Sequence, residues 1–235
     1  MPNSARPTDA GVAMDPRLRI LTAAGREFAA RGYEAVTVRD ICAAAGVNVA
    51  AVNYYFGDKR RLYIESVKHA HQERGRQVPL PQWTEGTPPG RKLRDFVDNL
   101  LERMLGFSQP PWQVRLMMRE VLQPTDACRE LVEDYVRPRF ALLVSILDEL
   151  VEGRLPDAEL RRVALSIIAQ CFLYRAAGDV VAMLVPEREI ASHHALRPLA
   201  DHVTNYALAA LGAGPPIAVG APGVAVGLGD QGRTR

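Results

Sequence analysis

The sequence predicts an all-α protein, and the prediction rests on composition and on the spacing of apolar residues. Ala and Leu are plentiful while aromatic residues make up only 6% of the 235 residues, which favours helices over sheets. No run of β-branched residues alternates with period two, whereas apolar residues recur three and four positions apart along most of the chain. Hydrophobic residues at 48% and charged residues at 24% are ordinary for a globular protein with a real core.

The first third of the chain predicts four helices, at about 16–31, 38–45, 48–55 and 59–77. The first has a continuous apolar face and ends at Gly32. Asp58 stands where an N-cap is needed for the fourth.

The second and third of these helices have the pattern of a helix-turn-helix. Thr37 is placed to cap the second helix, and Asp40 follows three residues later as its capping-box partner. Gly46 comes after the last apolar position, where a left-handed residue ends a helix and begins a tight turn. Asn48 is placed to cap the next helix. Two short helices joined in this way place a recognition helix in the major groove of DNA, so the pattern predicts a DNA-binding regulator.

A Pro- and Gly-rich link at 78–90 leads to five further predicted helices, near 90–106, 112–122, 126–152, 157–184 and 192–211. Pro138 is expected to kink or split the third of these. The fourth is apolar around much of its surface, which predicts a second partner helix. A four-helix bundle across a two-fold axis supplies that partner, and a helix deeply buried in a monomer is the alternative.

Charge is distributed unevenly along the chain. Residues 15–77 carry 11 Lys and Arg against 7 Asp and Glu, whereas residues 78–212 carry 15 against 18. A basic head on a mildly acidic body fits a DNA-binding domain joined to one that does not bind DNA. No secretory signal is apparent at the N-terminus, and no stretch approaches the roughly 18 apolar residues of a membrane span, so a cytoplasmic protein is expected.

Neither the cysteines nor the histidines predict a metal site or a cofactor. Cys42, Cys128 and Cys171 are far apart and lack partners at metal-ligand spacing, so each is expected to be a small buried hydrophobe in a reducing compartment. A redox role for one of them is the alternative. His69 and His71 are expected on an exposed helix, without the carboxylates that a metal would require.

Residues 17–62 resemble the N-terminal domain of the TetR family of one-component repressors, in the motifs FAARGYEAVTVRDICAAAGV and NVAAVNYYFGDKRRL. The segments LMMREVLQPT and VRPRFALLVSIL look like those of its CecR-like (YbiH-like) branch. The resemblance implies a homodimer, two heads that read a palindromic operator in double-stranded DNA, and a pocket for a small-molecule effector in each body. The expected organisation is a disordered N-terminus at 1–14, a helix-turn-helix domain at 15–60, a helical ligand-binding and dimerisation domain at 61–212, and a disordered tail at 213–235.

Eight residues match family positions that contact DNA: Thr37, Arg39, Asn48, Val49, Ala50, Asn53, Tyr54 and Lys59. Arg39 has a guanidinium fork suited to guanine O6 and N7, with a phosphate contact or an ordinary surface role as the alternative. Tyr54 and Lys59 are expected to reach phosphates. Asn53 departs from the family pattern, which more often has Tyr there, and its amide suits either a phosphate or adenine.

Seven residues of the middle helices are candidates for the effector pocket: Trp112, Arg115, Met118, Arg119, Tyr135, Phe172 and Tyr174. They combine apolar bulk with cations, which suits an amphiphilic or aromatic compound with anionic character. Core packing with solvated arginines is the alternative for each of them.

The sequence therefore predicts a ligand-responsive repressor, in which the helix at 59–77 and the VPLPQW link move the heads when ligand binds. Activation, or a helix-turn-helix used for protein contacts, is the alternative function. An enzyme on an all-α scaffold would need Glu-x-x-His on facing helices or a nucleophile elbow. The sequence contains neither pattern, so no catalytic residues are expected.

Overall fold

The computed structural model describes residues 15–106, 111–189 and 195–215, and helices are the only regular structure in this part of the chain. The all-α prediction is confirmed. The four N-terminal helices form as α1 (Pro16–Arg31), α2 (Val38–Ala45), α3 (Val49–Phe56) and α4 (Lys59–Gln77). The segments predicted to be disordered, 1–14 and nearly all of 213–235, lie outside the described residues.

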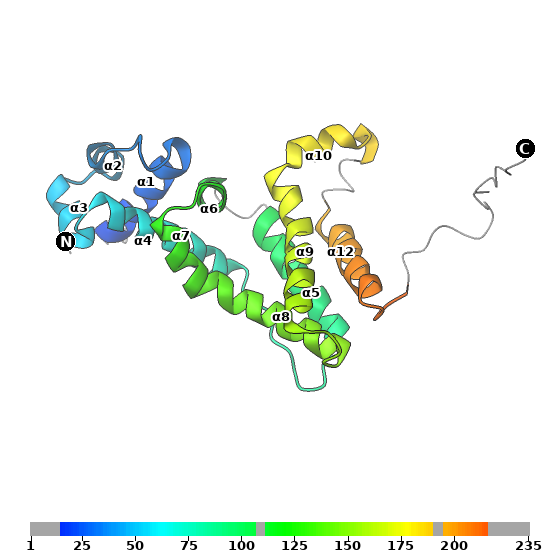
Figure 1. Ribbon diagram of the computed structural model, residues 1–235. Helices are drawn as coiled ribbons and strands as arrows, with labels where there is room; N and C mark the ends of the chain where they lie inside the picture. The colour runs from blue at the N-terminus through cyan, green and yellow to red at the C-terminus, as the bar shows by residue number, and fades with distance from the viewer. Residues whose placement is uncertain (1–14, 107–110, 190–194, 216–235) are drawn as a thin grey trace, which may run out of the picture.

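The remaining helices are α5 (Pro89–Leu105), α6 (Pro111–Leu122), α7 (Asp126–Leu131), the π-helical turn η1 (Val132–Val136), α8 (Arg137–Val151), α9 (Asp157–Ala176), α10 (Gly178–Leu184) and α12 (Leu196–Ala210). Together they make an elongated molecule, with α1 to α4 forming a head at one end and α5, α8, α9 and α12 a body at the other (Figure 1). Helix α6 lies between the two, and α4 and α8 run along the length of the molecule (Figure 1).

The break expected near Pro138 takes the form of a π-helical turn just before it. Within η1 the backbone N–H of Arg137 donates to the carbonyl of Val132, five residues back instead of four. A proline ring inside a regular α-helix collides with the carbonyl four residues earlier and donates no hydrogen bond. The wider turn accommodates the start of α8, whose second residue is Pro138.

The single helix predicted over 157–184 is wrong, because the chain bends by 87° between α9 and α10. The bend lies at Ala177, which leaves helical geometry at φ −129° and ψ 30°, and Gly178 begins the next helix. Glycine destabilises a helix interior by about 1 kcal/mol relative to alanine, and the break falls directly before Gly178. Within the described residues no single helix is long and apolar enough to cross a membrane, and α9 and α10 reach that length and composition only as a bent pair.

Two hydrophobic cores stabilise the molecule. The first lies in the head, where the helices pack around fully buried residues such as Phe28 and Ile41. Leu116 of α6 and Leu131 of α7 belong to the same core, so these helices are part of the head although they follow the link in sequence. The second core joins α5, α8, α9 and α12. Each fully buried Leu, Ile or Phe contributes about 1.5–3 kcal/mol relative to an exposed one.

Candidate DNA-binding surface and effector cavity

Local hydrogen bonds fix the start of α2. The Thr37 Oγ accepts the backbone N–H of Asp40 at 3.2 Å, and the Asp40 carboxylate accepts the backbone N–H of Thr37 at 2.9 Å. These bonds from Thr37, together with the Arg31 guanidinium 2.9 Å away, lower the pKa of Asp40. The predicted capping box is therefore confirmed. Because the Thr37 N–H is occupied by Asp40, only the hydroxyl proton of Thr37 remains to donate to a phosphate.

The turn between α2 and α3 is held by α1. Gly46 has φ 63° and ψ 43°, a left-handed conformation that glycine adopts without the steric cost of a Cβ. Arg19 of α1 donates from Nη2 to the carbonyl oxygens of Ala45 and Gly46, at 2.6 and 3.0 Å. Asn48 then caps α3, since its Oδ1 accepts the backbone N–H of Ala51 at 2.9 Å. The recognition helix is thus fixed at its start by its own cap and by α1.

Seven of the eight predicted DNA-contacting residues lie on α2, α3 and the residues that cap them, and all seven are exposed: Thr37, Arg39, Asn48, Val49, Ala50, Asn53 and Tyr54. The exposure of large side chains is informative here, because Tyr54 is 82% exposed and Val49 42% exposed on an element that buries Val52 and Phe56 completely or nearly so. A helix with a clean buried face and an exposed face of small, aromatic and amide residues is available to a groove. The structure brings these residues to one end of the molecule.

Lys59, the eighth residue, is half-buried and already has partners. Its Nζ donates to the Glu34 carbonyl oxygen at 3.4 Å and lies 4.5 Å from the centre of the Tyr33 ring. The ammonium therefore sits at the start of α4, near the turn between α1 and α2. A phosphate at this position would replace or share the long carbonyl contact.

A cavity of about 340 Å³ lies where α4, α5, α6, α8 and α9 meet. Its wall is mostly apolar, with Phe96, Met117, Phe140 and Phe172 among the lining side chains. This volume is at the lower end of the range for small-molecule sites, which are mostly apolar with a few polar groups.

Three buried or half-buried arginines line the same cavity. Arg74 of α4 donates from Nε to the Arg103 carbonyl at 2.8 Å, and Arg103 of α5 donates from Nη1 to the carbonyls of Arg74 and Val78, at 3.2 and 2.9 Å. Arg139 of α8 lies beside His71, with 3.3 Å between Nη1 and the imidazole Nε2. Burial lowers the pKa of Arg103 to about 9, and the neighbouring Arg139 and Arg74 act in the same direction.

His71 is buried, which corrects the expectation that it lies on an exposed face of its helix. Its side chain is 9% exposed, and burial together with Arg139 and Arg103 lowers its pKa to about 3. The imidazole is therefore neutral, and the positive charge around the cavity comes from guanidinium groups. His69 is half-buried, and burial is also the main cause of its lowered pKa.

The seven predicted pocket residues fall in different places. Met118 and Phe172 line the cavity. Tyr135 lines a neighbouring open hollow of about 290 Å³ on the other side of Arg139 and His71, where its hydroxyl accepts Gln72 Nε2 at 2.7 Å. The other four lie elsewhere: Trp112 and Arg119 against the head, Arg115 in solvent, and Tyr174 against the body core.

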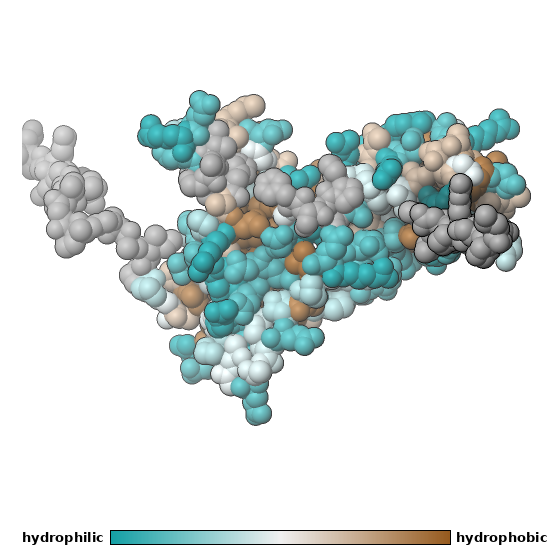
Figure 2. Space-filling model, turned by 180° about the vertical axis from the view of Figure 1, so that it is seen from behind, coloured by the Kyte–Doolittle hydropathy of each residue, from teal (hydrophilic) through white to brown (hydrophobic). Residues whose placement is uncertain are grey.

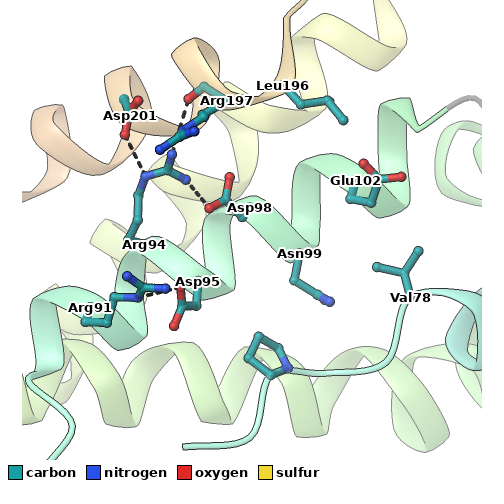
Figure 3. A pocket seen from close by; sticks show the side chains of 11 residues that line it. Val78, Arg91, Arg94, Asp95, Asp98, Asn99, Glu102, Leu196, Arg197 and Asp201 are labelled. Carbon is teal, nitrogen blue, oxygen red and sulfur yellow. Dashed lines mark hydrogen bonds and ion pairs between the residues drawn. The ribbon is translucent and has the colours of Figure 1, made fainter.

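A larger hollow, of about 840 Å³, is an open groove between α5, α12 and the link at Val78 (Figure 3). Most of its charged side chains pair with one another, as Figure 3 shows for Arg91 with Asp95 and for Arg94 with Asp201, each pair at 2.8 Å. Arg94 also pairs with Asp98 (Figure 3). Because most of its charges are already paired and it is open to solvent, the groove is a weaker candidate for an effector than the apolar cavity.

Helix α6 connects the cavity to the head. One face carries Val114, Met117 and Met118 into the cavity wall. The opposite face packs on α1, where the Trp112 ring occupies the space that a Cβ at Gly25 would take. Next to it, Glu120 is completely buried and accepts the Tyr63 hydroxyl of α4 at 2.6 Å. Helix α6 therefore contacts the cavity and both helices that flank the helix-turn-helix, α1 and α4.

Ion pairs join α7 and η1 to α4. Lys68 contacts Glu130 at 2.6 Å and Asp134 at 2.9 Å, and Arg60 contacts Asp126 at 2.7 Å. These pairs are partly exposed, so each contributes at most about 1 kcal/mol. Within the described residues, no three His, Cys, Asp or Glu side chains come together as a candidate metal site.

The cavity residues that were not predicted from the sequence include His71, Arg74, Arg103 and Arg139. Arg74 and Arg103 pair across 29 residues of sequence, so no local pattern announces their contact. The available indication was the position of Arg103, which falls on the apolar face of α5 seven residues after Phe96. A cation on a buried face requires a partner, and that argument would have selected it.

Comparison with known proteins gives matches along most of the chain. Residues 20–65 match the family model described as bacterial regulatory proteins, tetR family. Residues 89–211 match the model of the C-terminal domain of the HTH-type transcriptional dual regulator CecR.

Curated relatives and solved structures agree with these matches. The CecR regulator of Shigella flexneri is 28% identical over 179 residues, which is 70% of this chain and 78% of that protein. The HTH-type transcriptional regulator BetI of Brucella abortus is 29% identical over 141 residues, or 59% of this chain and 70% of that one. A tetR-family regulatory protein from Rhodococcus RHA1 has the same fold, with a TM-score of 0.61 at 18% identity over 83% of this chain and 96% of its own.

Proposed function

The chain belongs to the TetR family of ligand-responsive, DNA-binding transcriptional regulators, and we propose that it acts as a homodimeric repressor. Its two heads bind the halves of a palindromic operator, and a small molecule in the cavity of each body releases them. The protein is not an enzyme. The protein acts in the cytoplasm, where the operator DNA lies.

The observation that carries the proposal is that α6 contacts both the cavity and the core of the head. Its two faces belong to the cavity wall and to the head core, through Met118 on one side and Trp112 and Leu116 on the other. A ligand shifts a conformational equilibrium only by binding one state more tightly than the other. If α6 and α4 are oriented differently in two states of the protein, the ligand makes different contacts with them in each state. These contacts therefore couple ligand binding to the orientation of the DNA-binding face.

The proposed DNA contacts are assigned by position on the head. The major groove is contacted by Arg39, by Tyr54 and by the small residues at the start of α3, which enter or flank it. Tyr54 is 82% exposed. Lys59 and the Thr37 hydroxyl bind phosphates at the starts of α4 and α2.

Apolar side chains left exposed on α9 and α12 support the dimer. Leu165 and Leu173 of α9 are 57% and 52% exposed, and Tyr206 of α12 is 48% exposed. Seen from behind, the surface is largely hydrophilic and its apolar areas form separate patches (Figure 2). Exposed apolar side chains on two helices of one body suit a four-helix interface with a second copy.

Selection of DNA from a random pool by the purified protein tests the proposal. We expect an enriched palindrome with two half-sites, bound with an affinity that falls steeply as salt rises. Arg39→Ala is expected to weaken binding about 5- to 150-fold and to relax the preference at one base pair. Lys59→Ala is expected to weaken binding to all sequences and to reduce the salt slope by about 1.

Arg91→Ala is the matched control, because Arg91 is an exposed cation on α5, far from the head. Failure to enrich any sequence would contradict DNA recognition. If Arg39→Ala and Lys59→Ala bound like the parent, the contact assignments would be wrong while recognition itself stood.

Transcriptional activation is a second candidate, favoured by one finding: the Shigella flexneri relative is named a dual regulator. A reporter gene behind the selected operator separates the two. Expression that rises when this protein's gene is deleted indicates repression, and expression that falls indicates activation.

A further inference from the structure

We propose that the cavity beneath α6 takes an organic anion, a molecule with a single carboxylate or equivalent acid on an aromatic or alkyl body, held by Arg103, Arg139 and Arg74. This inference rests on the proposed function, because it assigns a ligand class to the same cavity. It concerns what is bound, and not whether binding changes the affinity for DNA.

The cavity concentrates positive charge that the described residues leave unbalanced. Arg74 is 1% exposed and Arg103 is 7% exposed, and their hydrogen bonds go to main-chain carbonyl oxygens. None of the described lining residues of the cavity is Asp or Glu. Buried charges are costly unless they are paired, and a neutral carbonyl does not supply the opposite charge.

Glu102 is the acidic residue that acts on Arg74, because its negative charge partly opposes the lowering of the pKa of Arg74. Its side chain, however, lines the open groove on the other face of α5, as Figure 3 shows. It therefore balances one guanidinium from outside the cavity.

The cationic groups converge on one turn of α4. An added Cβ at Gly75, which lines the neighbouring hollow beside the cavity, would lie 3.8 Å from Arg103 Nη1 and 4.0 Å from Arg139 Nη2, so these two guanidiniums, from α5 and α8, approach the same turn. Guanidinium groups brought near one another repel unless an anion lies between or beside them. A carboxylate with two oxygens fits the fork of an arginine and accepts from two arginines at once.

An unused donor points in the same direction. Within the described part of the chain, Nη1 of Arg74 is buried and has no hydrogen-bond partner. A buried donor left unpaired costs about as much as a lost hydrogen bond, and a charged donor costs more. Because Arg74 lines the cavity, an acceptor brought by the ligand would satisfy it.

The rest of the wall selects for an apolar body. Phe96, Phe140 and Phe172 supply aromatic surface, and Met117 and Met118 supply adaptable thioether side chains. The other titratable groups in the wall are His71, which is neutral, and Arg175 of α9, which is exposed. A cation would meet only like charges and is disfavoured, while a neutral molecule of the same shape would leave the guanidiniums unbalanced.

An anion at this position would also act on α4. Arg74 belongs to the last turn of α4, Arg103 to α5 and Arg139 to α8, so one carboxylate would tie the C-terminal end of α4 to two body helices. That end is opposite to the one on which the helix-turn-helix is built. Binding of the anion would thus fix the angle between α4 and the body.

Titration calorimetry of the full chain, without DNA, tests the inference. Three probes share one phenylbutyl skeleton and differ in their polar group: 4-phenylbutyrate, 4-phenylbutanol and 4-phenylbutylamine. Nonanoate and nonanol repeat the comparison with an alkyl body. We expect each carboxylate to bind on the order of 10- to 100-fold more tightly than its alcohol, because charge-assisted hydrogen bonds replace neutral ones. The amine is expected to bind most weakly.

Arg139→Met removes one cation whose contact here is His71, and it keeps an apolar side chain of similar length. We expect it to bring carboxylate and alcohol to within about threefold of each other while the alcohol binds as before. Arg139→Lys keeps the charge and is expected to restore part of the preference. Arg91→Met, which removes an exposed cation of the groove, is expected to bind all probes like the parent.

Equal affinity for carboxylate and alcohol, or no binding of any carboxylate up to its solubility, would overturn the inference. Loss of carboxylate binding in Arg91→Met would also overturn it, because the anion site would then be the groove. A protein that shows the expected preference but binds no operator contradicts only the proposed function. One that binds its operator and prefers neutral probes contradicts only this inference.

Discussion

His71 is held neutral in the wall of the cavity, and its burial has a consequence for stability. In the folded protein its pKa is lowered to about 3, first by burial and then by Arg139 and Arg103, from an ordinary value of 6.5. Below pH 6.5 the unfolded chain therefore binds a proton that the folded chain does not. The stability that His71 contributes is full above pH 6.5 and is lost as the pH falls from 6.5 toward 3.

His71→Gln is accordingly expected to lose less stability than the parent when the pH is lowered from 7 to 5. The difference is on the order of 1–2 kcal/mol, because glutamine does not titrate. Urea unfolding at the two pH values measures it. His202→Gln, which changes an exposed histidine of α12, is the control and is expected to follow the parent. If His71→Gln followed the parent too, the histidine would titrate normally in the fold.

Residues differ in how well the sequence predicts their roles. The caps Thr37 and Asn48 are confirmed because a cap is a local contact, made within three residues of the same chain. The surroundings of Arg103 depend on Arg74 and Arg139, which are 29 and 36 positions away. Such a cluster is decided by tertiary packing, and an arginine on a helix is ordinarily expected to reach solvent.

At the scale of elements, α6 is the proposed connection between ligand and DNA. Its contact with α1 depends on a glycine, because a Cβ at Gly25 would overlap the Trp112 ring. Gly75 of α4 is a second helical glycine, but a Cβ there would meet its nearest neighbour only at 3.8 Å, an ordinary contact.

Gly25→Ala and Gly75→Ala are therefore expected to differ in sign. The first should destabilise the protein by about 1–3 kcal/mol, since the Trp112 ring must move. The second should be neutral or stabilising by up to about 1 kcal/mol, because alanine favours a helix over glycine. Thermal and urea unfolding compare them. Equal effects of the two changes would show that α6 does not pack tightly on α1 at this point.

Element boundaries show where sequence patterns are sufficient. The four N-terminal helices are confirmed because each begins or ends at a residue with a local conformational reason, such as Gly46 or Asp58. The bend at Ala177 was not predicted, because apolar residues continue through it on both sides. A composition that suits a long helix also suits two helices that meet at an angle, and packing decides between them.

For the whole molecule, the proposed dimer makes a specific prediction about its exposed apolar faces. The parent is expected to sediment at twice the chain mass of 25.8 kDa. Leu173→Glu on α9 is expected to sediment as a monomer, because a carboxylate would be buried in the interface.

Leu122→Glu is the control for this experiment, since Leu122 is 65% exposed on α6, which is not one of the proposed interface helices. It is expected to remain dimeric. A monomeric parent would contradict the dimer directly. A dimeric Leu173→Glu would place the interface on other side chains.

The central claim is that a ligand in the cavity changes the affinity of the heads for DNA. One titration tests this claim most directly. Operator affinity is measured by fluorescence anisotropy at rising concentrations of a molecule shown by calorimetry to bind the cavity. We predict that affinity falls by about 5- to 150-fold and levels off at the concentration that saturates the cavity. Operator affinity that stays constant at full occupancy of the cavity would contradict the account.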